Sequence, residues 1–185
     1  SATGTIVFAT QTGVEYSING TTYQASATFT GVAPGNYTLR VRSTTDNSCT
    51  ATGSIVTVNA AVAYGTVASG NQTICNGATP SAMSVSGATG SGSFTYQWYS
   101  QSGIVAAPTG SSTTGWTSLG TTGGANTATY TPALGISSST TYACLVTPGG
   151  SPTCGTATWA TSARQVTVST VINYGTVASG NQTIC

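Results

Sequence analysis

The chain contains no histidine and no lysine, and five of its 185 residues carry a charge: Glu15, Arg40, Arg42, Asp46 and Arg164. Charged residues make up 3% of the sequence, against about 25% in an average soluble domain. General acid–base catalysis usually depends on histidine or on paired carboxylates, and a serine or cysteine nucleophile needs a neighbouring base. We therefore expect no enzymatic activity and assign no catalytic residue.

The same scarcity of charge limits the partners that the chain can bind. Binding to nucleic acid needs a basic patch, and binding to anionic lipid needs clusters of lysine and arginine. Three arginines are too few for either. Calcium sites need several carboxylates, and zinc sites need closely spaced cysteines or histidines. We expect no nucleic acid, no membrane contact by this segment, no metal and no cofactor.

The residues that are abundant favour strands. Threonine and valine are frequent, and β-branched residues prefer β-structure to helix. No window has the apolar spacing of a helix. Apolar and polar residues alternate instead, for example in Tyr37–Arg42, Phe94–Tyr99 and Thr140–Val146, with turn residues between such segments. The pattern predicts an all-β chain of Ig-like or fibronectin-like β-sandwich modules.

One stretch occurs twice without a change. YGTVASGNQTIC runs from Tyr64 to Cys75 and again from Tyr174 to Cys185, which gives a period of 110 residues. An exact repeat of this length indicates tandem duplication. The chain is therefore expected to be a piece of a longer repeat array.

The repeat and the turn signals together predict a modular organisation. The expected parts are a small module at 1–59, a linker at 60–63, a larger module at 64–169, a linker at 170–173, and the first strand of the next module at 174–185. Both linkers are short and lack glycine and proline. Short joints favour an extended rod over a flexible chain.

Local signals in the first module predict two turns. Asn19-Gly20 follows an alternating segment and is the strongest short signal for a two-residue type I′ hairpin, in which Tyr16 would face Tyr23. The turn Pro34-Gly35-Asn36 leads into Tyr37, and this arrangement resembles the tyrosine corner of Ig-like sandwiches.

Five aromatic residues are candidates for structural or binding roles. Tyr37, Trp98 and Tyr142 are expected to be structural core residues, with Trp98 as the strand-C tryptophan of an Ig-like sandwich. Trp116 and Trp159 lie in polar surroundings, and two interpretations stay open for them. Either they stack on sugar rings at the surface, or they are buried under the long 101–124 segment.

Several motifs resemble the repeats of very large Bacteroidota surface adhesins. The first module resembles SprB-like repeats of gliding-motility adhesins, and the second resembles their Ig-like tandem repeats. The motifs are GVEYSINGTTYQASATFTGVAPGNYTLRV (Gly13–Val41), DNSC (Asp46–Cys49), NQTIC (Asn71–Cys75), YQWYS (Tyr96–Ser100), YTPAL (Tyr130–Leu134) and TTYACLVT (Thr140–Thr147). The resemblance covers nearly the whole chain.

The resemblance implies an extracellular, cell-surface location, type IX secretion, and a part in adhesion, gliding or filament formation. On this interpretation the segment is a structural repeat whose main partners are neighbouring repeats of the same chain. Two alternatives stay open. One is a glycan-binding module that uses Trp116 and Trp159, and the other is a subunit that associates laterally with copies of itself, since weak charge repulsion favours association.

Five cysteines are typical of an oxidising compartment. Their positions leave open whether Cys154 pairs with Cys144 across a hairpin or with Cys75. The family resemblance implies a Cys75–Cys154 disulfide, with Cys144 left free and buried. Cys49 and Cys185 are expected to have partners outside this segment.

Overall fold

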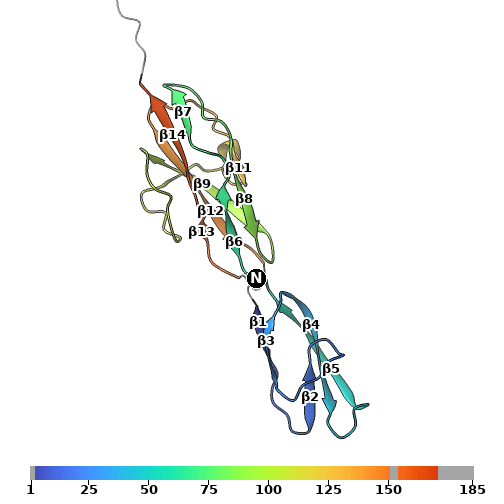
Figure 1. Cartoon of the computed structure of the whole chain (residues 1–185). Helices are drawn as coiled ribbons and strands as arrows, with labels where there is room; N and C mark the ends of the chain where they lie inside the picture. The colour runs from blue at the N-terminus through green and yellow to red at the C-terminus, as the bar shows by residue number, and fades with distance from the viewer. Residues whose placement is uncertain (1–2, 151–153, 171–185) are drawn as a thin grey trace, which may run out of the picture. The chain divides into compact units, whose positions relative to one another are not determined.

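β-strands are almost the whole of the regular secondary structure in the part that the structure describes, residues 3–150 and 154–170 of a computed structural model (Figure 1). Those residues form fourteen strands and one turn of 3₁₀ helix, η1 (Thr122–Gly124). The predicted all-β class is confirmed. Among the described residues, no helix has the length and apolar character needed to cross a membrane.

The strands are short, and their bounds follow in chain order. They are β1 (Gly4–Val7), β2 (Val14–Ser17), β3 (Thr28–Val32), β4 (Gly35–Ser43), β5 (Thr50–Val58), β6 (Ala63–Val67), β7 (Gln72–Cys75), β8 (Met83–Thr89), β9 (Phe94–Ser102), β10 (Thr117–Ser118), β11 (Thr129–Tyr130), β12 (Thr140–Pro148), β13 (Thr158–Trp159) and β14 (Arg164–Ser169).

Residues 3–59 contribute two antiparallel sheets, here called the N-terminal sheet pair. One sheet pairs β1 with β3, and the other has the order β2-β4-β5. Aromatic rings link the two sheets, because the Phe8 ring lies 5.0 Å from that of Tyr16 on β2 and 5.7 Å from that of Phe29 on β3. Tyr16 is buried together with Ile6 and Val32, so these residues form the centre of this core.

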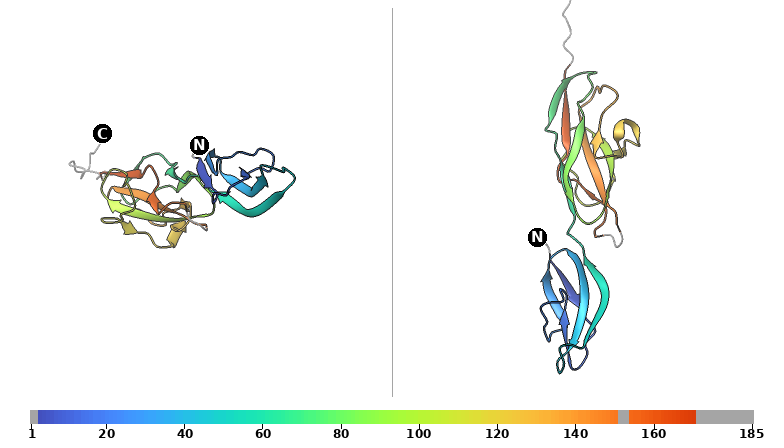
Figure 2. Two further views of the ribbon diagram at one scale, coloured as in Figure 1. Left: turned by 90° about the horizontal axis from the view of Figure 1, so that it is seen from below. Right: turned by 90° about the vertical axis from the view of Figure 1, so that its right-hand side faces the viewer.

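Residues 60–170 contribute two further sheets, here called the C-terminal sheet pair. One has the order β10-β9-β12-β14-β7, with β13 also paired to β12, and the other has the order β11-β8-β6. Figure 2 shows these strands from two further sides. Trp98 on β9 is fully buried, and its ring lies 6.1 Å from that of Tyr130 on β11 in the other sheet. The two sheets therefore pack against each other around Trp98.

One pairing in the C-terminal sheet pair is parallel. β14 runs beside β7 in the same direction, with Val166 opposite Gln72 and Ser169 opposite Cys75. β12 is antiparallel to β14, with Thr140 opposite Val166. β7 and β14 thus end together, and the chain leaves the sheet at that end.

Contacts divide the described residues into two compact units in a different way from the sheets. One unit holds 3–65, 87–95, 146–150 and 154–158, and the other holds 66–86, 96–145 and 159–170. Among the described residues, no sheet joins a strand of 3–59 to a strand of 60–170. The module boundary predicted at 60–63 stays a prediction, and the strand predicted at 174–185 lies outside the described residues.

The predicted Asn19-Gly20 hairpin is wrong. Tyr16 bridges to Gln24 rather than facing Tyr23, and β2 pairs with β4. Only Gly20 of the two turn residues has a positive φ, so the turn is not type I′. The reason is local hydrogen bonding: Asn19 Oδ1 accepts from the backbone N–H groups of Thr21 and Thr22, which holds a wider loop.

Candidate functional site

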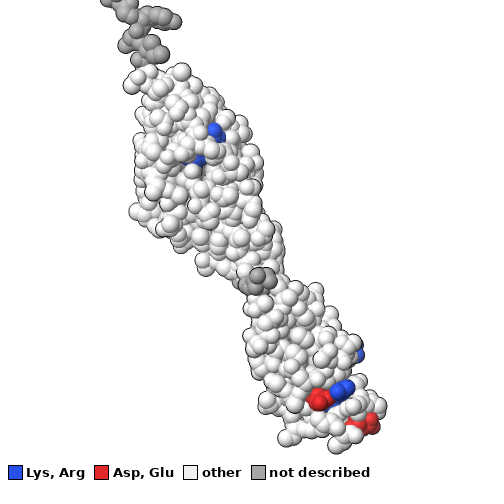
Figure 3. Space-filling view, in the orientation of Figure 1, with Lys and Arg blue, Asp and Glu red and all other residues white. Residues whose placement is uncertain are grey.

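Uncharged residues cover almost all of the molecular face shown in Figure 3. In the N-terminal sheet pair, Arg42 and Glu15 form an ion pair of 2.8 Å between Nη2 and Oε2. The Arg42 guanidinium also lies 4.2 Å from the centre of the Tyr23 ring, in cation–π geometry. Arg42 and Glu15 pair with each other, so this surface is neither a positively nor a negatively charged binding site.

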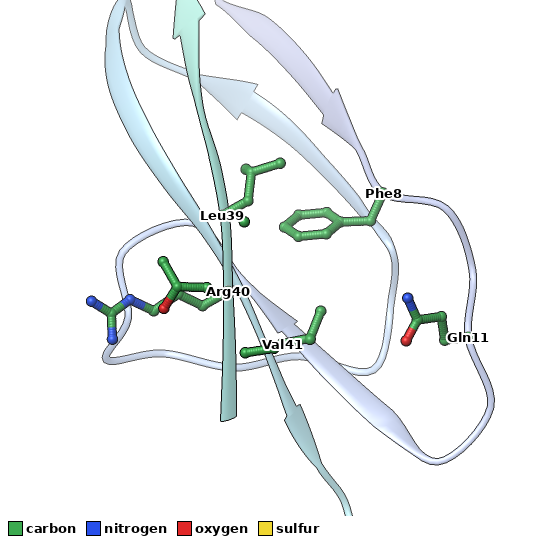
Figure 4. Close-up of a pocket in the computed structure, with 8 residues that line it drawn as sticks. Phe8, Gln11, Leu39, Arg40 and Val41 are labelled. Atoms are coloured by element: carbon green, nitrogen blue, oxygen red, sulfur yellow. The ribbon is translucent and has the colours of Figure 1, made fainter. Parts of the chain in front are cut away.

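An apolar hollow of about 220 Å³ opens in the N-terminal sheet pair (Figure 4). Phe8, Leu39 and Val41 turn their side chains toward it, whereas Arg40 points away from them. Because the side chains that face it are mostly apolar, the hollow offers packing surface.

Three aromatic rings gather where β9, β13 and the loop before β10 meet. The Trp159 ring lies 5.2 Å from Tyr99, edge to face, and 5.4 Å from Trp116. Trp159 Nε1 donates to Ser112 O at 3.0 Å, and the Trp159 backbone N–H donates to Gly110 O at 3.0 Å. The cluster therefore holds the Gly110–Trp116 loop against β13.

Burial decides between the two interpretations of these tryptophans. Trp159 is 2% exposed, so neither face of its ring can stack on a sugar, and the glycan-stacking hypothesis is wrong for this residue. Trp116 is half-buried and packs on Trp159. The packing interpretation, with the long loop covering Trp159, explains the cluster.

The predicted core residues differ in burial. Trp98 and Tyr142 are buried, and Trp98 Nε1 donates to Thr127 O at 3.0 Å. Burial raises the pKa of Tyr142. Tyr37 is only half-buried, but its hydroxyl donates to Ala33 O at 2.8 Å, which is the upstream backbone bond of a tyrosine corner.

Arg164 is the single charged residue between positions 60 and 170, and it is 4% exposed. Its Nη1 donates to Ser81 O and Ala82 O, and its Nη2 donates to Gln72 Oε1 and Ser81 Oγ, all at 2.8–2.9 Å. Its Nε is buried without a partner. Gln72 lies on β7 of the same sheet, whereas Ser81 and Ala82 precede β8, so Arg164 connects β14 to the other sheet through these two residues. The sequence shows that Arg164 is charged, but nothing in the sequence indicates that its side chain is buried.

All four described cysteines are free thiols, so the predicted Cys75–Cys154 disulfide is absent from the structure. Cys75 lies beside Ser169 where β7 and β14 end. Cys154 follows β12 in the chain. Cys144 is free and buried, and burial raises the pKa of its thiol to about 12. Cys49 is exposed, and Cys185 lies outside the described residues.

One surface feature was not singled out from the sequence. Leu134 in the loop after β11 is 80% exposed, the largest exposure among the bulky apolar residues described. Beside it an open cavity of about 270 Å³ has apolar walls that include Leu119, Ile136 and Tyr142. An exposed leucine next to an apolar hollow is a candidate contact surface.

No protein-family model, curated protein or solved structure matches the chain. Across the described residues, no group of three or more metal-ligating side chains comes together. Two features of the described residues are candidate contact surfaces: the hollow beside Phe8 and the Leu134 loop.

Proposed function

We propose that the chain is a structural repeat segment of a long extracellular surface adhesin or filament, built from Ig-like β-sandwich modules and without enzymatic activity. The observation that carries the proposal is the exact recurrence of Tyr64–Cys75 at Tyr174–Cys185. Repetition of a whole unit extends a protein in one dimension. Two packed sheets per part and an uncharged surface are consistent with such a role.

The location is tested on the cells that produce the protein, with antibodies raised against residues 1–185. We expect gold-labelled antibody to decorate intact cells, and we expect a surface-applied protease to remove the label. Labelling that requires permeabilised cells would rule out the surface location.

The adhesive role needs a separate experiment. Monovalent antibody fragments against the segment are expected to reduce attachment or gliding, while fragments against an unrelated surface protein leave both unchanged. Imaging of the labelled structures then distinguishes a single-chain stalk, one module wide, from a polymer of several chains.

A second candidate, lateral association of copies, is favoured by β5. This edge strand of the β2-β4-β5 sheet is exposed from Thr50 to Ile55, with Ile55 67% exposed, and it carries no charge or proline. Edge strands of this kind pair with other chains unless they are protected. Sedimentation velocity compares association of the parent chain with that of Ile55→Lys. If the parent associates as its concentration rises and the variant associates equally, pairing through β5 is contradicted.

A further inference from the structure

The Leu134 loop lies at the end of the sheet from which the chain leaves. Gly77, two residues after Cys75, donates its backbone N–H to Ile136 O at 2.9 Å, and Ile136 N–H donates to Ala78 O at 3.1 Å. Cys75 is opposite Ser169, the last residue of β14. The loop is therefore fixed next to the point where the chain continues.

The loop is held rigidly in this place. A Cβ atom on Gly135 would overlap the Gly77 carbonyl, so the two backbones are in close contact. Leu134 directly precedes this contact, and its side chain is 80% exposed. Burying an exposed leucine side chain lowers the free energy by about 2 kcal/mol. A neighbouring module that covers Leu134 would therefore stabilise the contact by a similar amount.

The next copy of the repeated unit begins within reach. Four residues, 170–173, lie between Ser169 and Tyr174, where the repeated sequence starts again. An extended chain covers at most about 3.5 Å per residue, so Tyr174 is less than about 18 Å from the end of β14. A tether of this length gives an effective concentration in the millimolar range, at which even weak apolar contact is populated.

The start of the unit has a surface suited to this contact. Near Val62, before β6, the Gly90–Ser93 loop packs on Gly149, whose N–H donates to Ser93 O at 2.7 Å. These loops consist of glycine and serine and carry no charge. Small residues permit close approach of a leucine side chain.

We propose that the Leu134 loop is the docking surface for the following copy of the repeat in the same chain, which places its glycine- and serine-rich first loops on Leu134. The proposal rests on the repeat-array function, since it requires a following copy. It assigns to this surface the role of orienting successive repeats.

The test extends the full chain. Residues 76–170 are appended after Cys185, and because 174–185 repeat 64–75, this completes a second copy behind the natural joint. Leu134→Ser is then made in the first copy, and the equivalent leucine of the second copy is changed to serine as the matched control. The control leucine has the same local surroundings and no copy after it.

Nitrogen-15 relaxation measures whether the two copies tumble together. We expect one common correlation time for the extended chain and for the control, and separate, shorter correlation times for the first-copy variant. Folded copies that tumble alike in both variants would overturn the docking surface while leaving the repeat array intact. Appended residues that do not fold would overturn the repeat interpretation, and the docking surface with it.

Discussion

At the scale of single residues, the burial of Arg164 has the largest consequence for stability. Four hydrogen bonds to neutral acceptors replace the water that its guanidinium loses on folding. Arg164→Met leaves the Ser81 and Ala82 carbonyls without this donor. We predict a fall of about 3 kcal/mol in the free energy of unfolding.

Urea denaturation followed by tryptophan fluorescence measures this loss, because all three tryptophans lie in the C-terminal sheet pair. Arg164→Lys separates charge from geometry, since it keeps the charge but has a single nitrogen. Lysine is expected to recover only part of the stability. A methionine variant as stable as the parent would show that the hydrogen bonds merely balance the cost of burying the charge.

The buried thiol of Cys144 gives a prediction about reactivity. Burial raises its pKa to about 12, so the reactive thiolate does not form near neutral pH. We expect a thiol reagent at pH 8 to modify the exposed Cys49 and Cys75 in the folded chain, and Cys144 only after unfolding. Mass mapping of the labelled peptides checks this, and rapid native labelling of Cys144 would contradict its burial.

The same shift sets the response of stability to alkaline pH. The folded state holds the thiol proton more tightly than the unfolded state, whose thiol pKa is about 8.5. This contribution to stability is complete below that pH and is lost as pH rises toward 12. Urea unfolding at pH 8 and pH 10 should show a smaller alkaline loss for Cys144→Ala than for the parent.

At the scale of elements, Trp159 organises the long loop before β10. Its two hydrogen bonds to Gly110 and Ser112 and its contact with Trp116 hold that loop in place. Trp159→Ala is expected to lower the free energy of unfolding by about 3–5 kcal/mol. Trp116→Ala removes a half-buried ring and is expected to cost less.

Limited digestion with a protease of broad specificity provides the structural measure for this pair, because Trp116 is the one aromatic residue in 109–118 and its replacement would remove a chymotrypsin site. Cleavage within residues 109–118 should become rapid in Trp159→Ala and change little in Trp116→Ala. Equal effects of the two substitutions would mean that the half-buried ring contributes as much as the buried one, contrary to the burial of the two residues.

The elements also show what the sequence reveals and what it does not. The alternation of Thr140–Val146 predicts most of β12, and that of Phe94–Tyr99 predicts most of β9. Such patterns depend only on which face of a strand is buried. The type I′ turn predicted at Asn19-Gly20 is wrong because side-chain hydrogen bonds of Asn19 and the pairing of β2 with the distant strand β4 determine the course of the backbone there.

The candidate contact surfaces could not be predicted in the same way. Leucine is usually buried, and nothing local marks Leu134 as the exception. The neighbouring Ile136 is hydrogen-bonded to Gly77, far away in sequence. The burial of Arg164 likewise depends on acceptors contributed by other strands. Tertiary packing, rather than residue type, sets both.

At the scale of the whole molecule, the absence of histidine and lysine makes the charge nearly independent of pH around neutrality. Histidine is the side chain whose ordinary pKa makes it change charge between pH 5 and 8, and the chain has none. We predict that the free energy of unfolding at pH 5.5 and pH 8 agrees within about 0.5 kcal/mol. It should also respond little to sodium chloride below 0.5 M, since few charges are available to be screened.

The parallel pairing of β7 and β14 has a consequence for the chain under tension. A pull on its two ends drags β7 toward its start and β14 toward its end, so the four residue pairs from Val166↔Gln72 to Ser169↔Cys75 are sheared at once. A pull between residue 134 and residue 170, both at one end of the sheet, would instead separate contacts one after another. Single-molecule stretching should give a higher unfolding force for the first geometry. Equal forces would show that another part of the fold yields first, whereas a higher force for the first geometry would mean that the register of two strands sets the mechanical strength of the unit.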